Sequence, residues 1–267
     1  MDLNRFQRAA KLQDAGQIAE ALKEYQSLAN AITDVGEKAS VMLNEVNCLS
    51  QLGENEQARK RLSEVYNLLP EHSEMRVHAQ FTEALLYKDE GKDEQALKRL
   101  NELLADHGKL LRTPSHEFLW REIQIRRGIV LSELGRSSEA RPILEEALSF
   151  EELANADRGN DRGTVLYYLA RSYLDLGEFI LAEEKYVDAL KQDLPEGFQP
   201  LAHYELGLVY YQRKAFARAI QEFELAESKT DESCLSKRSI WEWLSVTCKH
   251  LGLNSEADRY EKLAKTP

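Results

Sequence analysis

Residues 134–148 read LGRSSEARPILEEAL, and residues 176–190 read LGEFILAEEKYVDAL. The two stretches lie 42 residues apart, and both place Leu-Gly at the start, Ala at the seventh position and Ala-Leu at the end. A phrase repeated in register over such a distance indicates a chain that is assembled from copies of one small structural unit.

A glycine followed five residues later by an alanine marks each copy of this unit, and in one copy a lysine replaces the glycine. The pairs are Gly16/Ala21, Gly53/Ala58, Gly91/Ala96, Gly135/Ala140, Gly177/Ala182, Lys214/Ala219 and Gly252/Ala257. Successive turns lie 37 to 44 residues apart, a period typical of helical solenoids. We therefore expect a single array over residues 1–267 of about seven units, with turns near residues 16, 53, 91, 135, 177, 214 and 252 and with no separate effector domain.

Each unit has the apolar periodicity of two helices, one on either side of its turn. After the turn, apolar residues follow the alanine by four and by seven positions, which is one face of a helix. Before the turn, six of the seven units have a small residue seven positions ahead: Ala9, Ala84, Gly128, Ala170, Gly207 and Ser245. We expect the small residues to let the two helices approach closely, and the glycine to adopt the left-handed conformation that ends the first helix. The pattern predicts an all-α protein.

Two stretches, LYYLARSYLDLGEF (166–179) and AHYELGLVY (202–210), resemble the tetratricopeptide repeat, and each is followed by its Ala and a Tyr or Phe. The resemblance extends from about residue 2 to residue 265. It implies antiparallel helix pairs stacked into a right-handed α-solenoid with a concave inner face. Several units exceed the usual length of about 34 residues, as do repeats of kinesin light chain and of bacterial regulatory proteins. ARPIL (140–144) is similar to these longer repeats at Pro142, where we expect a late helix start or a slight bend.

The first helices of the N-terminal units depart from the pattern eight residues before the turn. The polar residues Arg8, Glu45, Glu83 and Arg127 stand where the later units have Leu169, Leu206 and Leu244. We expect the N-terminal first helices to be rotated, or to pack against longer neighbours.

Composition and charge argue against several classes of protein. The formal net charge of −11 and the pI of about 5.2 disfavour nucleic acid binding. The sequence has no run of 18 apolar residues, so we expect no membrane insertion, and its first residues do not resemble a signal peptide. The cysteines Cys48, Cys234 and Cys248 show no paired spacing, which favours reduced thiols and a cytoplasmic location.

No motif points to catalysis, to a metal or to a cofactor, so we expect the chain not to be an enzyme and to hold no cofactor. The glycines of DRGNDRG (157–163) suit a phosphate cradle, but a solvated turn is the favoured interpretation because no strand precedes them. Cys248 occupies a buried position of the repeat, which favours a structural role for it over a metal site with His250. A basic run leaves two alternatives open, a receptor for an acidic peptide or phosphate and a set of paired surface charges. Its members are Lys109, Arg112, Arg121, Arg126 and Arg127.

The resemblance implies that partners bind the concave face through residues ten, six and three positions before each turn. From these positions we select seven groove residues, which are Tyr167, Arg171, Tyr204, Leu208, Tyr211, Asn47 and Lys88. Tyrosines offer a large contact area at little cost in rotamer entropy. We expect Tyr167, Tyr204 and Tyr211 to be exposed because other residues fill the packing positions of their helices, and packing against a neighbouring helix is the alternative. At the equivalent positions Phe6, Leu43, Phe81 and Ile125 we expect core packing.

The expected function is that of a non-enzymatic scaffold or adaptor, which binds a peptide or helix segment of another protein in its concave groove. The alternative is a peptide-responsive regulatory receptor, in which the bound peptide changes the curvature of the superhelix and thereby controls a partner protein. The sequence leaves the identity of the partner and the oligomeric state open.

Overall fold

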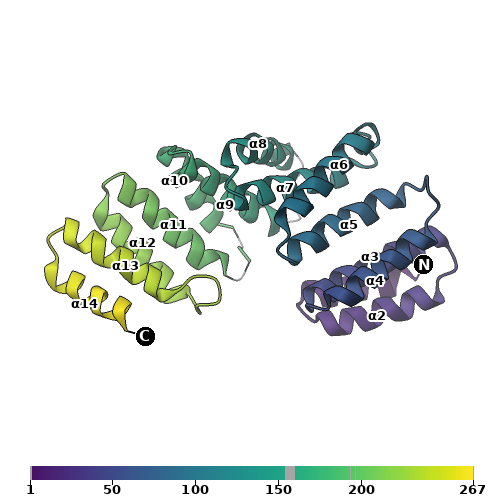
Figure 1. Cartoon of the computed structure of the whole chain (residues 1–267), viewed down its shortest axis with the longest axis horizontal. Helices are drawn as coiled ribbons and strands as arrows, with labels where there is room; N and C mark the ends of the chain where they lie inside the picture. Colours follow the sequence, from purple (N-terminus) through teal and green to yellow (C-terminus); the bar gives the residue numbers. More distant parts are fainter. Residues whose placement is uncertain (1, 154–159, 193, 196, 267) are drawn as a thin grey trace. The chain divides into compact units, whose positions relative to one another are not determined.

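The computed structural model describes residues 2–153, 160–192, 194–195 and 197–266, and within them the chain is all helical, with fourteen α-helices and no strand (Figure 1). The all-α fold is thus confirmed. The helices are α1 (Leu3–Asp14), α2 (Ile18–Ala31), α3 (Val35–Gln51), α4 (Asn55–Leu68), α5 (Met75–Asp89), α6 (Asp93–Leu111), α7 (Glu117–Glu133), α8 (Ser137–Leu153), α9 (Asn160–Asp175), α10 (Phe179–Leu190), α11 (Phe198–Gln212), α12 (Phe216–Lys229), α13 (Lys237–His250) and α14 (Asn254–Lys265).

Consecutive helices pair into repeats, which we number 1 to 7 from α1/α2 to α13/α14, and we call the members of each pair its first and second helix. The chain forms two compact units, an N-terminal unit (Met1–Ile123) and a C-terminal unit (Gln124–Pro267). Repeats 1 to 3 belong to the N-terminal unit and repeats 5 to 7 to the C-terminal unit, while α7 contributes to both. We describe each unit by itself, and the single array over 1–267 stays a prediction.

The turn inside each repeat has the predicted left-handed residue. The six turn glycines have φ between 71° and 76°, and Lys214, which replaces the glycine in repeat 6, has φ 60°. At every turn the residue after this position donates its backbone N–H to the carbonyl five residues earlier, as in Gln17 to Leu12 at 2.9 Å and Ala215 to Tyr210 at 2.8 Å. This bond satisfies a carbonyl at the end of the first helix, which explains why the helix ends there.

Close packing within a repeat depends on the small residues, as predicted. The alanines five residues after the turns are buried in all seven repeats, with Ala182 at 0% exposure. A Cβ atom on Gly207 would lie 2.6 Å from Cε1 of Phe223, and one on Gly128 would lie 2.6 Å from Cδ2 of Leu144. The first helices of repeats 4 and 6 therefore approach their second helices at a distance that no side chain would permit.

The polar residues eight positions before the turns have a different explanation from the expected rotation. Glu45 is 1% exposed, and both of its oxygens accept hydrogen bonds of 2.8 Å from Arg61 on the second helix of the same repeat. Repeat 3 has the same arrangement, with Arg99 Nε 2.9 Å from Glu83. The expectation of rotated helices is wrong for these repeats, because Val46 and Ala84, the next residues along, remain buried against the second helix.

Repeat 1 reverses the charges of this pair, since Arg8 on its first helix lies 3.8 Å from Glu24 on its second. Each partner stands eight residues after the turn, so the ion pairs of repeats 1 to 3 join equivalent positions. The position eight before the turn can therefore hold a charge when the opposite charge stands eight residues after it.

Pro142 lies inside α8, which runs without a break from Ser137 to Leu153. Since the helix starts five residues earlier, the proline removes one backbone hydrogen bond near the N-terminal end. The side chains of Ser138 and Pro142 are both exposed, so water can reach the carbonyl that loses its partner. The expected late start is not found, because α8 begins two residues after Gly135, as the other second helices do after their turns.

Neighbouring repeats of the C-terminal unit are joined by hydrogen bonds from a tyrosine to a carboxylate. The hydroxyl of Tyr173 in repeat 5 donates to Glu145 of repeat 4 at 2.6 Å. The hydroxyl of Tyr210 in repeat 6 donates to Glu183 of repeat 5 at 3.1 Å. In each case the later repeat supplies the phenol and the earlier repeat supplies the carboxylate from its second helix.

Candidate functional site

The candidate site lies on the first helices of the C-terminal unit, α9, α11 and α13. We define the first-helix face by the partly or fully exposed residues six and three positions before the turns, together with the half-buried aromatic residues beside them. These are Arg171, Leu174, Tyr204, Leu208, Tyr211, Trp243, Val246 and Lys249. Figure 1 shows α11 and α13 in the same half of the chain, with α12 packed against both. The face therefore belongs to one compact unit.

Tyr167 does not belong to this face, and its predicted exposure is wrong. The side chain is 1% exposed, and its ring meets the rings of Phe198 at 5.1 Å and Tyr186 at 6.0 Å in edge-on contacts. Phe198 lies within the turn-forming segment PEGFQP (195–200) and opens α11, so the following repeat covers Tyr167. The prediction considered the packing positions of one helix pair and omitted the neighbouring repeat.

Tyr204, Leu208 and Tyr211 follow one another along one side of α11, and all three are partly exposed. Tyr204 packs on the ring of Phe223 at 5.8 Å. The Tyr211 ring meets that of Trp243 at 5.0 Å, and its hydroxyl is 2.9 Å from Nε2 of His250. These contacts fix the rings in place, so the face presents aromatic and aliphatic surface that is ordered before anything binds to it.

Trp243 was not among the predicted groove residues, although its ring contacts the predicted Tyr211. Val246, on the same helix, is 40% exposed, which is unusual for a large apolar residue of a packed helix. Trp243 stacks on Phe223 at 6.3 Å and so joins α13 to α12. An indole nine residues before a turn, where repeats 5 and 6 have Tyr168 and Glu205, is the signal that would have found it.

Arg171 and Glu205 form the polar part of the site. Arg171 Nε lies 3.8 Å from Oε1 of Glu205, and the side chains are 36% and 14% exposed. The hydroxyl of Tyr186 donates to the other oxygen of Glu205 at 2.7 Å. Burial raises the pKa of the Glu205 carboxyl above its ordinary value, while the Tyr186 hydroxyl and the Arg171 charge oppose that shift. Burial acts against the charge of Arg171, but Glu205 and Tyr167 raise its pKa, so the guanidinium stays charged.

The two remaining predicted groove residues, Asn47 and Lys88, belong to the N-terminal unit. Both are partly exposed, and the Lys88 ammonium lies 3.7 Å from a carboxylate oxygen of Asp93. Core packing is confirmed at Leu43 and Ile125, which are 6% and 1% exposed, whereas Phe6 and Phe81 are partly exposed. The structure describes Asn47 and Lys88 within their own unit and leaves their role in binding untested.

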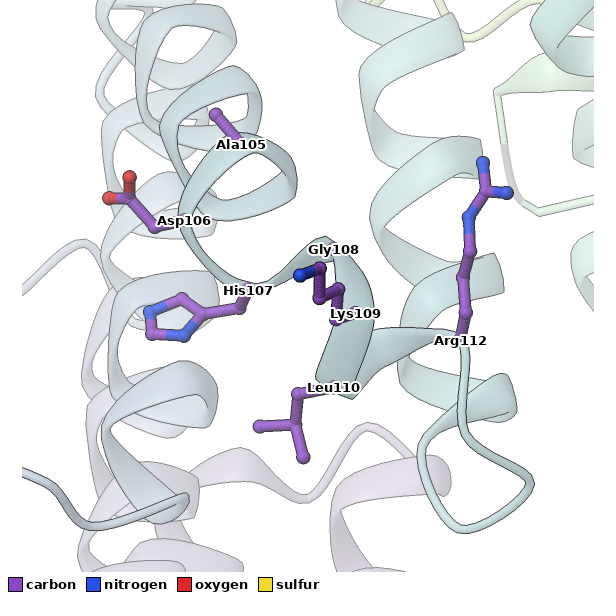
Figure 2. A pocket seen from close by; sticks show the side chains of 7 residues that line it. All are labelled: Ala105, Asp106, His107, Gly108, Lys109, Leu110 and Arg112. Carbon is purple, nitrogen blue, oxygen red and sulfur yellow. The ribbon is translucent and has the colours of Figure 1, made fainter.

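A hollow of about 680 Å³ lies at the C-terminal end of α6 in the N-terminal unit (Figure 2). It is lined by residues 105–110 and by Arg112. Figure 2 shows the side chains of Lys109 and Arg112 extending in different directions, with the Asp106 carboxylate near His107. The Arg112 guanidinium lies 6.0 Å from the centre of the Trp120 ring. The two cations of the basic run that line this hollow therefore do not converge on one anion.

The described residues give little support to the other sites considered from the sequence, which were a metal site and a phosphate cradle. Cys248 is 2% exposed, as its buried position in the repeat predicts, and all three cysteines are free thiols. Across the residues that the structure describes, no group of three or more metal-binding side chains comes together. Residues 157–159 of the glycine-containing segment DRGNDRG lie outside the described residues. Within the described ranges, no helix combines the length and apolarity that crossing a bilayer requires.

Comparison with known families finds one match, which lies within the C-terminal unit. The tetratricopeptide repeat family model matches residues 167–233, which cover the second half of α9, all of α10 and all of repeat 6. No curated protein sequence is significantly similar to this chain.

Comparison with solved structures finds the same fold over most of the chain. A structure of PilF from Pseudomonas aeruginosa is similar with a TM-score of 0.64 and 19% identity, covering 86% of this chain and 92% of that chain. The apo form of the quorum sensor NprR from B. thuringiensis is similar with a TM-score of 0.76 and 13% identity, covering 98% of this chain and 74% of that chain. A Podosopora anserina protein with repeats like those of kinesin light chain is similar with a TM-score of 0.55 and 19% identity, covering 73% of this chain and 96% of that chain. At these identities the likeness establishes a helical-repeat fold.

Proposed function

We propose, from the premise that this chain carries tetratricopeptide repeats, that it is a non-enzymatic scaffold or adaptor whose C-terminal unit binds a segment of another protein on the first-helix face. Proteins with this fold are generally interaction scaffolds, so the proposal adds the place of binding and the form of the ligand. The ligand is a peptide or a helix that lays apolar side chains against the face.

The observation that carries the proposal is the ordered aromatic surface of α11 and α13. Tyr204 and Trp243 each contact the buried ring of Phe223, and Tyr211 contacts Trp243, and yet each of the three retains some exposure. Leu208 and the 40% exposed Val246 add aliphatic surface beside them. Rigid aromatic groups of this kind lose little entropy on binding, which is why they dominate the energetics of many interfaces.

The alternative is a peptide-responsive regulatory receptor that uses the same face. It differs from a scaffold in that the ligand changes the arrangement of the repeats and so controls a second protein. NprR is described as a quorum sensor, and its likeness to this chain extends to the fold alone. Hydrogen exchange with and without bound ligand separates the two, because a receptor changes protection in repeats that the ligand does not touch, whereas a scaffold changes it only at the face.

The test begins by capturing partners of the full chain with a crosslinker and mapping the crosslinks by mass spectrometry. The binding of a captured partner is then measured for a Tyr204→Ala, Tyr211→Ala double variant, with circular dichroism to verify folding. We expect a loss of about 2 kcal/mol or more in binding free energy, as for hot-spot tyrosines. An Ile180→Ala, Leu181→Ala variant is the matched control, because these apolar residues are 71% and 38% exposed on a second helix. Unchanged affinity in the tyrosine variant would show that the assignment of the face is wrong.

We also propose a cytoplasmic location, which the three free thiols support.

A further inference from the structure

Arg171 is a fixed positive charge on the first-helix face whose hydrogen-bonding capacity is only partly used. Its nearest carboxylate oxygen is at 3.8 Å, which is longer than a hydrogen bond, and 36% of its side chain is exposed. A guanidinium carries five N–H donors in a planar fork, which suits a carboxylate that approaches with both oxygens.

The carboxylates near Arg171 are already engaged by hydroxyl groups of neighbouring repeats. Tyr186 donates to Glu205 at 2.7 Å, and Ser137 of repeat 4 donates to Asp175 at 2.6 Å. The titratable and charged groups that face Glu205 are Arg171, Tyr167, Tyr168 and Asp175 from α9, Tyr186 from α10 and Tyr204 from α11 itself. Arg171 is the one cation among these groups. Because Glu205 lies too far from Arg171 for a hydrogen bond, the guanidinium N–H groups can bind a carboxylate that approaches more closely.

We propose that the segment bound on the first-helix face carries a carboxylate that pairs with Arg171, next to apolar side chains that pack on Tyr204 and Leu208, and that Glu205 competes with this carboxylate for Arg171. The inference rests on the proposed function and names the chemistry of its ligand, an apolar segment with an acidic residue. Arg171 stands one repeat before Tyr204 and Leu208, so charge and apolar surface lie side by side on α9 and α11.

The competition between Glu205 and the ligand carboxylate for Arg171 makes the affinity for the ligand depend on pH. A ligand carboxylate beside Arg171 also lies near Glu205, and two like charges around one guanidinium raise the pKa of Glu205, which burial already raises. Binding therefore takes up a proton on Glu205, and linkage requires the affinity to increase as the pH falls towards the pKa of Glu205 in the complex. The increase ends near pH 4, where the ligand carboxylate itself becomes protonated.

The probe is a set of random dodecapeptides displayed on phage and selected on the full chain. Enriched peptides are synthesised in pairs, one with the selected Asp or Glu and one with the matching Asn or Gln. We expect enriched peptides to combine apolar residues with an acidic residue, and the amide form to bind about tenfold more weakly, as for the loss of a charged hydrogen bond.

Three single variants test which residue gives the preference for the acidic peptide over its amide form. Arg171→Gln should weaken the acidic peptide about tenfold and leave the amide peptide unchanged. Glu205→Gln should strengthen the acidic peptide at pH 7.5 and remove the dependence of its affinity on pH. Arg238→Gln is the matched control, because Arg238 is a 70% exposed cation on α13 outside the face, and it should change neither peptide. Circular dichroism of each variant verifies its folding.

The outcomes separate this inference from the function on which it rests. One outcome is a set of peptides that lose binding in the Tyr204→Ala, Tyr211→Ala variant but bind the parent protein equally in their acid and amide forms. That result would support binding at the first-helix face and overturn the role of Arg171. Peptides that bind the tyrosine variant as tightly as the parent protein would overturn the face as well. A selection that enriches no peptide counts against both.

Discussion

Repeats 2 and 3 of the N-terminal unit and repeat 6 of the C-terminal unit fill one position of the same frame with opposite chemistry. Eight residues before the turn, repeats 2 and 3 place Glu45 and Glu83, each bonded to an arginine of its second helix, whereas repeat 6 buries Leu206 at 1% exposure. In all three repeats the next residue, which is small or β-branched, packs against the second helix. The Gly, Ala and small positions therefore set the helix pairing, and in repeats 2 and 3 the adjoining position holds a carboxylate whose partner stands across the turn.

The buried leucine and the buried ion pair differ in how much stability the protein loses when one residue is replaced. A buried leucine contributes through the apolar area that it removes from water and needs no particular partner. A buried carboxylate loses its hydration and regains stability only through its ion pair and hydrogen bonds. The stability of repeats 2 and 3 should therefore fall more when one member of an ion pair is removed. Substitutions at these ion pairs test the comparison.

The largest effect should follow Glu45→Ala, which leaves Arg61 with Glu64 alone and opens a space beside Val46. We expect a loss of about 3 kcal/mol in the free energy of unfolding, measured by urea denaturation, as for one partner removed from a buried pair. Glu45→Leu combined with Arg61→Leu replaces the ion pair by apolar residues, with leucine at the position of Leu206, and should remain within about 1 kcal/mol of the parent protein. A double variant as unstable as the single one would show that repeats 2 and 6 do not share an interchangeable position.

A somewhat smaller effect should follow Gly207→Ala in repeat 6. The new Cβ would lie 2.6 Å from the Phe223 ring, which is 0% exposed and has little room to move. We expect a loss of about 2 kcal/mol from overpacking. The converse change, Ala84→Gly in repeat 3, should cost about 1 kcal/mol through helix propensity alone. Thermal unfolding followed by circular dichroism gives both values, and equal losses would mean that the helix approach in repeat 6 is no closer than in repeat 3.

Lys214→Gly should stabilise the protein, because it gives repeat 6 the glycine that the other six turns have. A non-glycine residue in the left-handed region costs about 1 kcal/mol, and Lys214 has φ 60°. The gain should therefore be about 1 kcal/mol by urea denaturation, while the converse change Gly177→Lys in repeat 5 should lose a similar amount. Destabilisation by Lys214→Gly would indicate that the lysine side chain stabilises the turn through a contact of its own.

The smallest effect is a dependence of stability on pH in the N-terminal unit. Burial raises the pKa of Glu45 above its ordinary value of 4.5, although Arg61 opposes that shift. A carboxyl group with a raised pKa in the folded state contributes stability that is fully present below the unfolded pKa and is lost as the pH rises through the folded pKa. Stability should thus fall slightly as the pH increases above about 4.5. Urea denaturation of the Glu45→Leu, Arg61→Leu variant should lack this slope, and a slope of the same size in that variant would assign it to other groups.

The sequence predicted the frame of the fold more completely than the candidate site. Turn residues and small residues act within one repeat, so their spacing along the chain is enough to place Gly177, Ala182 and Gly207 correctly. Tyr167 was misplaced because its burial depends on Phe198, which comes from the next repeat. The ion pair of Glu45 was missed for a similar reason, since Arg61 is sixteen residues away and one charge in an acidic helix gives little indication of its partner.

Glu205 could have been noticed within AHYELGLVY, where it is the acidic residue in an otherwise apolar stretch with one histidine. The role of Glu205 depends on its contacts with Arg171 and Tyr186, which lie in the preceding repeat. Contacts between repeats depend on how successive helix pairs stack, and no local spacing specifies that stacking. The fold is therefore more predictable than the chemistry of its surface.

The bonds of Tyr173 and Tyr210 share a direction, because each phenol reaches back from a first helix to a carboxylate on the second helix of the preceding repeat, whereas Tyr186 donates forward to Glu205. Repeat 5 contains both halves, accepting from Tyr210 through Glu183 and donating through Tyr173 to Glu145. A gene segment that encodes such a repeat can be duplicated in tandem, and each new junction then receives one donor and one acceptor without any compensating mutation. The junction thus works as a head-to-tail connector, through which the array can lengthen or shorten by whole repeats during evolution or in design.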